Sequence, residues 1–365
     1  MLPSRFRPPH ELIRELLDLP RPRRLLAAGS LRRYREPALV DHLVDQCFKH
    51  RYGDPEEMLA YAEVAVAAAR QLPPSASTSD ARCRAYLHLS NAHRRRAEFD
   101  LSATAMEQAK TEWAASSHKL ALKAEMKRLE GALLHDLRHL DSAALSFRTA
   151  AEHYLSLGDS ENYASSLISE GMALREAGDP QKAIVAFCHA LAALNDRADN
   201  KLRVSGLQSL AFSLCEAGKY EHAHLISRDC NRLFCSSKEP GIALRVEFLN
   251  AQIDDGLGLR LAAEHGYERC REGFAAVGML YEQALTTLHL AALLAEDGRR
   301  SEARELCGEV HEVFDTLGIA RESTAAFLLR EAMDYPKAEL LKTVAHYLER
   351  EGRQRKTPSP EGGIR

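Results

Sequence analysis

The feature of this sequence that most constrains its fold is a 40-residue internal repeat. Alanine recurs at this interval in a first column, Ala103, Ala143, Ala183, Ala223, Ala263 and Ala303. Glycine recurs five residues earlier, at Gly178, Gly218, Gly258 and Gly298. A column of small residues keeps the same phase: Gly131, Gly171, Ala211, Ala251 and Ala291. So does a bulky column: Tyr154, Leu194, Phe234, Phe274 and Phe314. Columns in a common phase predict that one structural unit is stacked along the chain.

Each unit is predicted to be two helices joined by a tight turn. In residues 166–194, apolar and small residues have helical spacing up to Gly178, which supplies the left-handed backbone that commonly ends a helix. Asp179 then provides an N-cap, and Pro180 suits the first position of the second helix. Small residues let the two helices approach closely. A column with a large residue at Phe147, Phe187 and Tyr267, but Ser227 and Cys307 in the other units, is expected to fill space between neighbouring units. Because one hairpin cannot bury both of its apolar faces, the units must stack into a solenoid.

The composition favours the same all-α fold class. The chain of 365 residues is 45% hydrophobic but only 6% aromatic, and Ala and Leu account for much of the apolar content. These residues favour close-packed helices over sheets. We therefore expect little or no β-strand.

The repeat columns resemble those of the tetratricopeptide (TPR) family over roughly residues 38–334, about seven units. This resemblance implies a right-handed superhelical solenoid of antiparallel helix pairs. The usual repeat has about 34 residues, so longer helices or the inter-repeat segments 195–201 and 235–240 must accommodate six more. HEAT and armadillo repeats, with periods of about 40–47 residues, are the alternative. The positions of the small-residue columns favour the TPR family.

The two ends of the chain depart from the repeat. Residues 1–37 form a predicted basic arm with a capping helix, since nine Arg against Glu11, Glu15 and Asp18 give residues 1–35 a charge of +6. Because the total charge is −3, the rest of the chain carries a charge of −9. The arm could instead occupy the groove of the solenoid or bind something else. Residues 335–350 are predicted to be a C-terminal capping helix and residues 351–365 a disordered tail.

Several classes of function are disfavoured by the sequence. No apolar run is long enough to span a bilayer, no signal-peptide core is present, and the eight Cys are spread without C-x-x-C pairs, so we expect a cytoplasmic protein. The sequence His135-Asp136-Leu137-Arg138-His139 approaches the zinc motif H-E-x-x-H, but Arg138 occupies the turn column, which places His139 beyond the helix. No Gly-rich phosphate loop is present. We therefore expect no enzymatic activity, cofactor, metal, nucleic acid or membrane partner.

The TPR resemblance implies that the first helix of each unit, helix A, lines a concave groove. Three columns on that helix vary from unit to unit, as a surface tuned to one partner would. The candidate partner-binding residues are Arg128, His135, Met172, Arg175, Gln208, Phe212, Glu216, Phe248, Gln252 and Leu288. Phe212 and Phe248 are predicted anchors if exposed, the alternative being that they belong to the core between units.

An acidic column, Asp136, Glu176, Glu216 and Glu296, is either a solvated face or a track for a basic segment. The sequence therefore predicts a scaffold or adaptor that binds a peptide or helical segment of another protein in this groove. The alternative is a regulator that senses a peptide or small ligand and acts through a separate effector.

Overall fold

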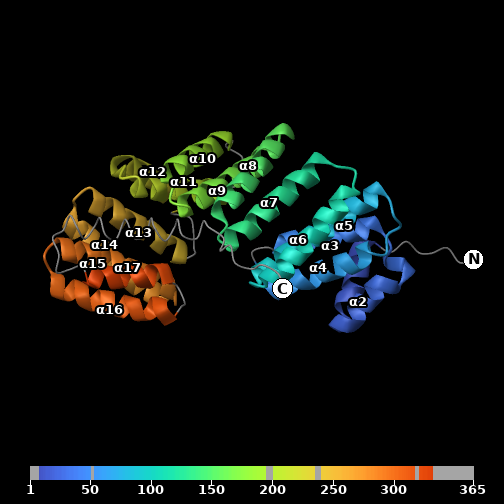
Figure 1. The fold of residues 1–365 in the computed structure, drawn as a ribbon, viewed down its shortest axis with the longest axis horizontal. Coiled ribbons are helices and arrows are strands. Elements are labelled where there is room, and N and C mark those ends of the chain that lie inside the picture. Colours follow the sequence, from blue (N-terminus) through green and yellow to red (C-terminus); the bar gives the residue numbers. More distant parts are fainter. Residues whose placement is uncertain (1–7, 51–52, 195–199, 235–239, 317–319, 332–365) are drawn as a thin grey trace, which may run out of the picture. The chain divides into compact units, whose positions relative to one another are not determined.

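The computed structural model describes residues 8–50, 53–194, 200–234, 240–316 and 320–331, and its regular secondary structure in these ranges is entirely helical (Figure 1). The first helices are α1 (Pro9–Leu17), α2 (Arg21–Ser30), the 3₁₀ helix η1 (Arg32–Tyr34), α3 (Pro37–Lys49), α4 (Pro55–Ala69), α5 (Ala76–Arg95) and α6 (Phe99–Ala114). The next are α7 (Leu120–Asp136), α8 (Leu140–Ser156), α9 (Ser160–Glu176), α10 (Pro180–Ala193), α11 (Asn200–Glu216) and α12 (Tyr220–Phe234). The last are α13 (Pro240–Gly256), α14 (Arg260–Ala276), α15 (Leu280–Glu296), α16 (Arg300–Thr316) and α17 (Ala320–Glu331).

The chain divides into two compact units, an N-terminal unit, Met1–Ala173, and a C-terminal unit, Leu174–Arg365. In the N-terminal unit, α3 packs on α4, α5 on α6 and α7 on α8. In the C-terminal unit, α11 packs on α12, α13 on α14 and α15 on α16. The first helix of each pair is helix A of the predicted repeat, and the second is helix B.

The 40-residue period arises from two long helices and two short turns. Helix starts recur every 20 residues, at Leu120, Leu140, Ser160 and Pro180, and α7, α8 and α9 each contain 17 residues. The six residues beyond the usual TPR length therefore lengthen the helices. Helix α11 already begins at Asn200, inside the segment expected to be a loop, while residues 195–199 and 235–239 lie outside the described residues.

The turns have the backbone that the glycine column predicts. Gly178 has φ of 85°, its N–H donates to Arg175 O at 2.9 Å, and the N–H of Asp179 donates to Leu174 O at 3.0 Å. The Asp179 side chain caps α10 by accepting from the N–H of Lys182, as predicted. Arg138 occupies the same turn position with φ of 63°, a conformation that disfavours residues with a Cβ atom.

Close helix approach explains why the small-residue column begins with glycine. A Cβ atom built on Gly131 would lie 2.9 Å from ring atoms of Phe147, which is buried at 4% exposure. Phe147 belongs to α8 and Gly131 to α7, so this large residue fills space inside its own pair. Phe147 thus occupies the room that Gly131 leaves within the pair. Tyr267, of the same large-residue column, does fill space between neighbouring units as expected, because its ring stacks on His289 of the next A helix with the centroids 5.8 Å apart.

Residues 8–37 pack on the first helix pair. Leu12 and Leu16 of α1 are buried in one cluster with Leu39 and Leu43 of α3. Three arginines of this segment bind locally: Arg21 forms an ion pair with Glu63 of α4, Arg33 with Glu15, and Arg24 donates to the carbonyls of Leu17 and Leu19 at the end of α1. The predicted C-terminal segments 335–350 and 351–365 lie outside the described residues.

Candidate functional site

In the C-terminal unit, the predicted partner-binding residues lie on consecutive A helices. Arg175 lies in the last turn of α9; Gln208, Phe212 and Glu216 lie on α11; Phe248 and Gln252 lie on α13; and Leu288 lies on α15. Residues four apart on an α-helix share a face, so the side chains of α11 form one row. Glu216 is exposed, while the others are half-buried except Phe248.

Phe248 is buried in the core between neighbouring units and is not an exposed anchor. It is 6% exposed, because Tyr267 of helix B and His289 of the next A helix surround its ring, with centroids 6.0 Å and 5.2 Å away. Phe212 lies against this cluster, with its ring centroid 6.3 Å from that of Phe248, and keeps part of its surface accessible. Phe212 is therefore the aromatic side chain that a ligand could contact.

Arg175 and Glu216 border Phe212. The Arg175 guanidinium carbon lies 5.8 Å from the Phe212 ring centroid, within the range of a cation–π contact. The same guanidinium forms an ion pair with Glu216 at 3.7 Å. The Phe212 ring, a cation and a carboxylate are thus adjacent on α9 and α11.

Gln252 lies on the helix-A face of α13, next to the aromatic cluster. Its Nε2 is 3.3 Å from Nε2 of His289, and burial lowers the pKa of His289 to about 4. The imidazole is therefore neutral near pH 7 and accepts the hydrogen bond from the Gln252 amide group. Gln252 Oε1 and Arg175 Nε are buried atoms without a hydrogen-bond partner among the described residues. Unused polar atoms of this kind are costly, and functional surfaces are one place where proteins retain them.

The remaining candidates, Arg128, His135 and Met172, lie in the N-terminal unit and are half-buried. His135 of α7 contacts Asp136 at 3.5 Å, and Arg128 lies close enough to Glu125 to lower the pKa of that carboxyl group. These residues share the A-helix face of their own unit.

An ion-pair network that no sequence motif indicated lies on α3, α5 and α7 of the N-terminal unit. Arg84 of α5 lies 3.4 Å from both Asp45 of α3 and Glu125 of α7. His88, 2% exposed, contacts Glu125 at 3.0 Å. Burial raises the pKa of the Glu125 carboxyl group, but the hydrogen bond to His88 and the charges of His88, Arg84 and Arg128 outweigh it and lower that pKa to about 2. Arg84 and Glu125 are 41 residues apart on helices that are not consecutive in the chain, so no local sequence pattern connects them.

The acidic column consists of residues that end the A helices and form ion pairs. Asp136 pairs with Arg94 at 2.6 Å, and Glu296 pairs with Arg260. The column is interrupted at Gly256, where a Cβ atom would collide with the ring of Tyr220. The glycine is therefore required by packing between α12 and α13.

The described residues show no group of three or more His, Cys, Asp or Glu side chains that could hold a metal ion. His135 lies within α7, whereas His139 is the N-cap residue of α8, as the turn column predicted. Burial raises the pKa of Cys47, Cys83 and Cys307 to about 12. No helix in the described ranges has the length and apolar character needed to cross a membrane.

Solved structures of other proteins share this architecture. The apo form of RapI matches with a TM-score of 0.60 at 12% identity, over 76% of this chain and 98% of that one. The apo quorum sensor NprR from B. thuringiensis matches with a TM-score of 0.55 at 14% identity, over 89% of this chain and 99% of that one. A signal transduction ATPase from Pyrococcus horikoshii with a tetratricopeptide repeat sensor, PH0952, matches with a TM-score of 0.60 at 12% identity, over 94% of this chain and 52% of that one.

The chain has a TPR-type fold. The all-α fold class predicted from the repeat columns is thereby confirmed. In sequence, no family model and no curated protein matches the chain. The TPR-type fold and the side-chain geometry are therefore the grounds on which a function can be proposed.

Proposed function

We propose that this TPR-type protein is a non-catalytic regulator that binds a peptide on the A-helix face of its C-terminal unit. The observation that carries the proposal is the group formed by Arg175, Phe212, Gln252 and Glu216. These residues combine an accessible aromatic ring, a cation, an amide and a carboxylate on neighbouring A helices. An extended peptide presents both side chains and a regular series of backbone donors and acceptors to such a surface.

Two features favour a peptide over a bulky rigid ligand. Gln208 and Gln252 each offer a donor and an acceptor, which suits backbone amides, and Gln252 Oε1 is unused within the described part of the chain. Phe212 offers a ring on which an apolar side chain of the ligand can bury area. The surface is lined by helices, so its residues are held in fixed positions along the ligand.

A regulatory role is favoured over a purely structural scaffold by the proteins with similar structures. NprR is described as a quorum sensor, and the Pyrococcus protein carries a tetratricopeptide repeat sensor. We propose that the chain likewise senses its peptide and passes the signal to a separate effector protein. A constitutive adaptor that uses the same face is the alternative.

The proposal is tested by selecting phage-displayed random dodecapeptides on the full chain. Enriched peptides should bind the variant Phe212→Ala/Gln252→Ala at least tenfold more weakly, because truncating a central aromatic hot spot removes about 2 kcal/mol or more of binding energy, and about 1.4 kcal/mol already corresponds to a factor of ten. The matched control Leu261→Ala/Glu272→Gln alters exposed positions of α14, a B helix, and should bind like wild type. Circular dichroism verifies that both variants remain helical.

Enriched peptides that bind both variants and the wild type equally would refute the assignment of the face. A selection that enriches no peptide would refute peptide binding itself.

A further inference from the structure

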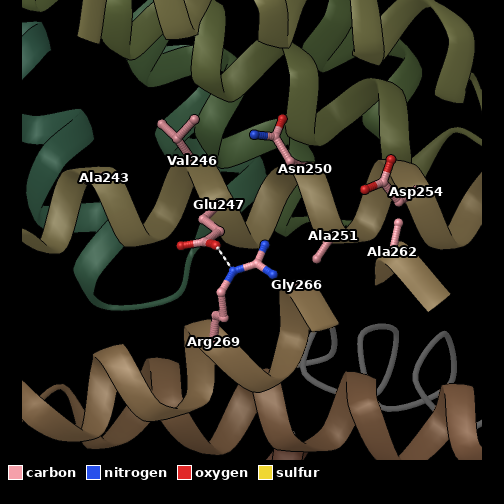
Figure 2. A pocket seen from close by; sticks show the side chains of 9 residues that line it. All are labelled: Ala243, Val246, Glu247, Asn250, Ala251, Asp254, Ala262, Gly266 and Arg269. Atoms are coloured by element: carbon pink, nitrogen blue, oxygen red, sulfur yellow. Dashed lines mark hydrogen bonds and ion pairs between the residues drawn. The ribbon is translucent and has the colours of Figure 1, made fainter. Parts of the chain in front are cut away.

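The C-terminal unit contains a cavity of about 300 Å³ between α13 and α14. Figure 2 shows Val246, Asn250 and Asp254 projecting from one side of α13, while Arg269 reaches from α14 toward Glu247. The volume is at the lower end of the range of about 300–1,000 Å³ for ligand sites. A cavity of this size fits a small molecule or one long side chain.

The cavity is separate from the proposed peptide-binding face. Successive residues of an α-helix are about 100° apart, so Asn250 and Asp254 point away from Phe248 and Gln252 respectively. A ligand could therefore occupy the cavity whether or not a peptide binds on the A-helix face.

Asp254 occupies a position at which the other repeats carry an apolar packing residue. The equivalent residue is leucine in the four other aligned A helices, at Leu134, Leu174, Leu214 and Leu294. Three of these leucines, Leu174, Leu214 and Leu294, are buried. In α13, the leucine that fills this place elsewhere is replaced by a shorter, charged side chain.

A second replacement enlarges the same space. Gly266 of α14 stands where the other repeats carry Ser146, Ala186, Ile226 and Leu306. A Cβ atom on residue 266 would lie 2.8 Å from the Cβ atom of Ala251. Close packing of Gly266 against Ala251 thus removes side-chain volume from the wall of the cavity, where both residues are found.

The charges around the cavity leave one carboxylate uncompensated. Glu247 accepts a hydrogen bond from Arg269 Nε at 2.6 Å, so these two charges neutralise each other. Asp254 has no ion pair or hydrogen bond to its carboxylate within the described residues, although His224 of α12 exerts a weak electrostatic attraction. Burial raises the pKa of Asp254, which is the expected response of a desolvated carboxylate without a partner.

Asn250 adds a hydrogen-bonding group beside Asp254. Its Oδ1 accepts from the Ser227 hydroxyl of α12 at 2.5 Å, which fixes the amide and leaves its Nδ2 group as a donor. The lining therefore combines one uncompensated negative charge with small apolar walls from Ala243, Ala251 and Ala262. Among the described residues no set of three ligands suitable for a metal ion is present, so an organic cation fits this lining better than a metal does.

We propose that this cavity binds the alkyl-ammonium or alkyl-guanidinium group of a ligand, with Asp254 as the counter-ion and the alanine and glycine walls around the alkyl chain. Such a group occurs in small amines and in the side chains of Lys and Arg in a peptide. A guanidinium offers several donors to a carboxylate in a fixed geometry, whereas an ammonium acts as a compact point charge.

The test compares n-butylguanidinium with n-butylurea, a neutral molecule of nearly the same shape, by isothermal titration calorimetry on the full chain at low ionic strength. We expect one site per chain and binding of the cation at least tenfold tighter than of the urea. The isosteric variant Asp254→Asn should lose this discrimination. The control Glu272→Gln, which removes an exposed carboxylate of α14 outside the cavity, should retain it.

A second variant, Asn250→Leu/Asp254→Leu, introduces the residues found at the equivalent positions of two other repeats, Leu210/Leu214 and Leu290/Leu294. This variant should preserve the fold and abolish binding. A blocked Gly-Arg-Gly peptide identifies the source of the cation. The peptide binds if the cavity accepts the side chain of a peptide, and it fails to bind if the cavity accepts only small free cations. Equal affinity for the cation and the urea, unchanged binding by Asp254→Asn, or no binding of the cation to the wild type at tens of millimolar would each overturn the proposal.

Discussion

Replacing Gly131 by alanine tests whether the small-residue column is dictated by the bulky residue opposite. The new Cβ atom would lie 2.9 Å from two ring atoms of Phe147 and 3.1 Å from a third. These distances are shorter than the optimal van der Waals separation of about 3.5–4.0 Å between carbon atoms. Overpacking of this kind costs about 1–3 kcal/mol, and the gain in helix propensity over glycine returns about 1 kcal/mol. We therefore expect Gly131→Ala to be neutral or to destabilise α7 and α8 by up to about 2 kcal/mol.

The effect of Gly131→Ala on stability should become favourable when the Phe147 ring is removed. In another repeat the equivalent pair is Ala291 and Cys307, so the background Phe147→Cys provides room for a Cβ atom. There, Gly131→Ala should stabilise the helix pair by about 1 kcal/mol, which corresponds to a coupling energy of about 1–3 kcal/mol between the two positions.

Hydrogen exchange, followed by mass spectrometry in peptides of α7 and α8, is the suitable assay because a repeat array need not unfold in one step. Gly308 serves as the control glycine, since a Cβ atom there meets nothing within 4 Å and Gly308→Ala should stabilise α16 by about 1 kcal/mol. An identical effect of Gly131→Ala in both Phe147 backgrounds would show that the ring does not dictate the glycine.

Three further predictions concern the turns and two buried ionisable groups. Gly178→Ala should cost about 1–2 kcal/mol because its φ is 85°, whereas Arg138→Gly, at φ of 63°, should stabilise its turn by a similar amount; hydrogen exchange of the flanking helices measures both, and changes of the same sign would contradict the strain argument. The pKa of Glu125 is about 2 in the folded chain against an ordinary value of 4.5, so its stabilising contribution is present above pH 4.5 and is lost as the pH falls toward 2. Urea unfolding at pH 2–7 should show that Glu125→Gln is less stable than the wild type at neutral pH, with the gap closing on acidification; a constant gap would argue against this contribution. The pKa of His289 is about 4 against 6.5, so the unfolded chain binds the extra proton and the C-terminal unit should lose stability between pH 6.5 and pH 4; a His289→Gln variant that retains the same pH dependence would refute the attribution.

The helix pairs and their turns could be predicted from the sequence because local interactions determine them. The left-handed backbone at Gly178 and the N-cap at Asp179 depend on residues within one turn. The placement of Arg138 at the same turn position also followed from the repeat register alone. Because such local signals recur from unit to unit, the prediction of a turn in one unit supports the prediction of a turn in the next.

The surface could be predicted only in part, because burial depends on residues from several helices. Phe212 and Phe248 lie on the same face of their A helices, yet Tyr267 and His289 cover Phe248. The cavity has a sequence signal, since Asp254 stands in a column that is otherwise leucine, but this column lies outside the three helix-A columns predicted to line the groove. Its volume could not be derived from the sequence, because it depends on how α13 and α14 approach each other.

The equal spacing of helix starts also bears on how such a chain can change in length. Arg260 and Arg300 both begin B helices, and each follows a turn with a left-handed glycine, Gly258 or Gly298. Excising residues 260–299 would join Leu259 directly to Arg300 and leave every later helix in phase, whereas excising 20 residues would place an A helix where a B helix belongs. Gene duplication or loss within this chain is therefore expected to proceed in whole 40-residue steps.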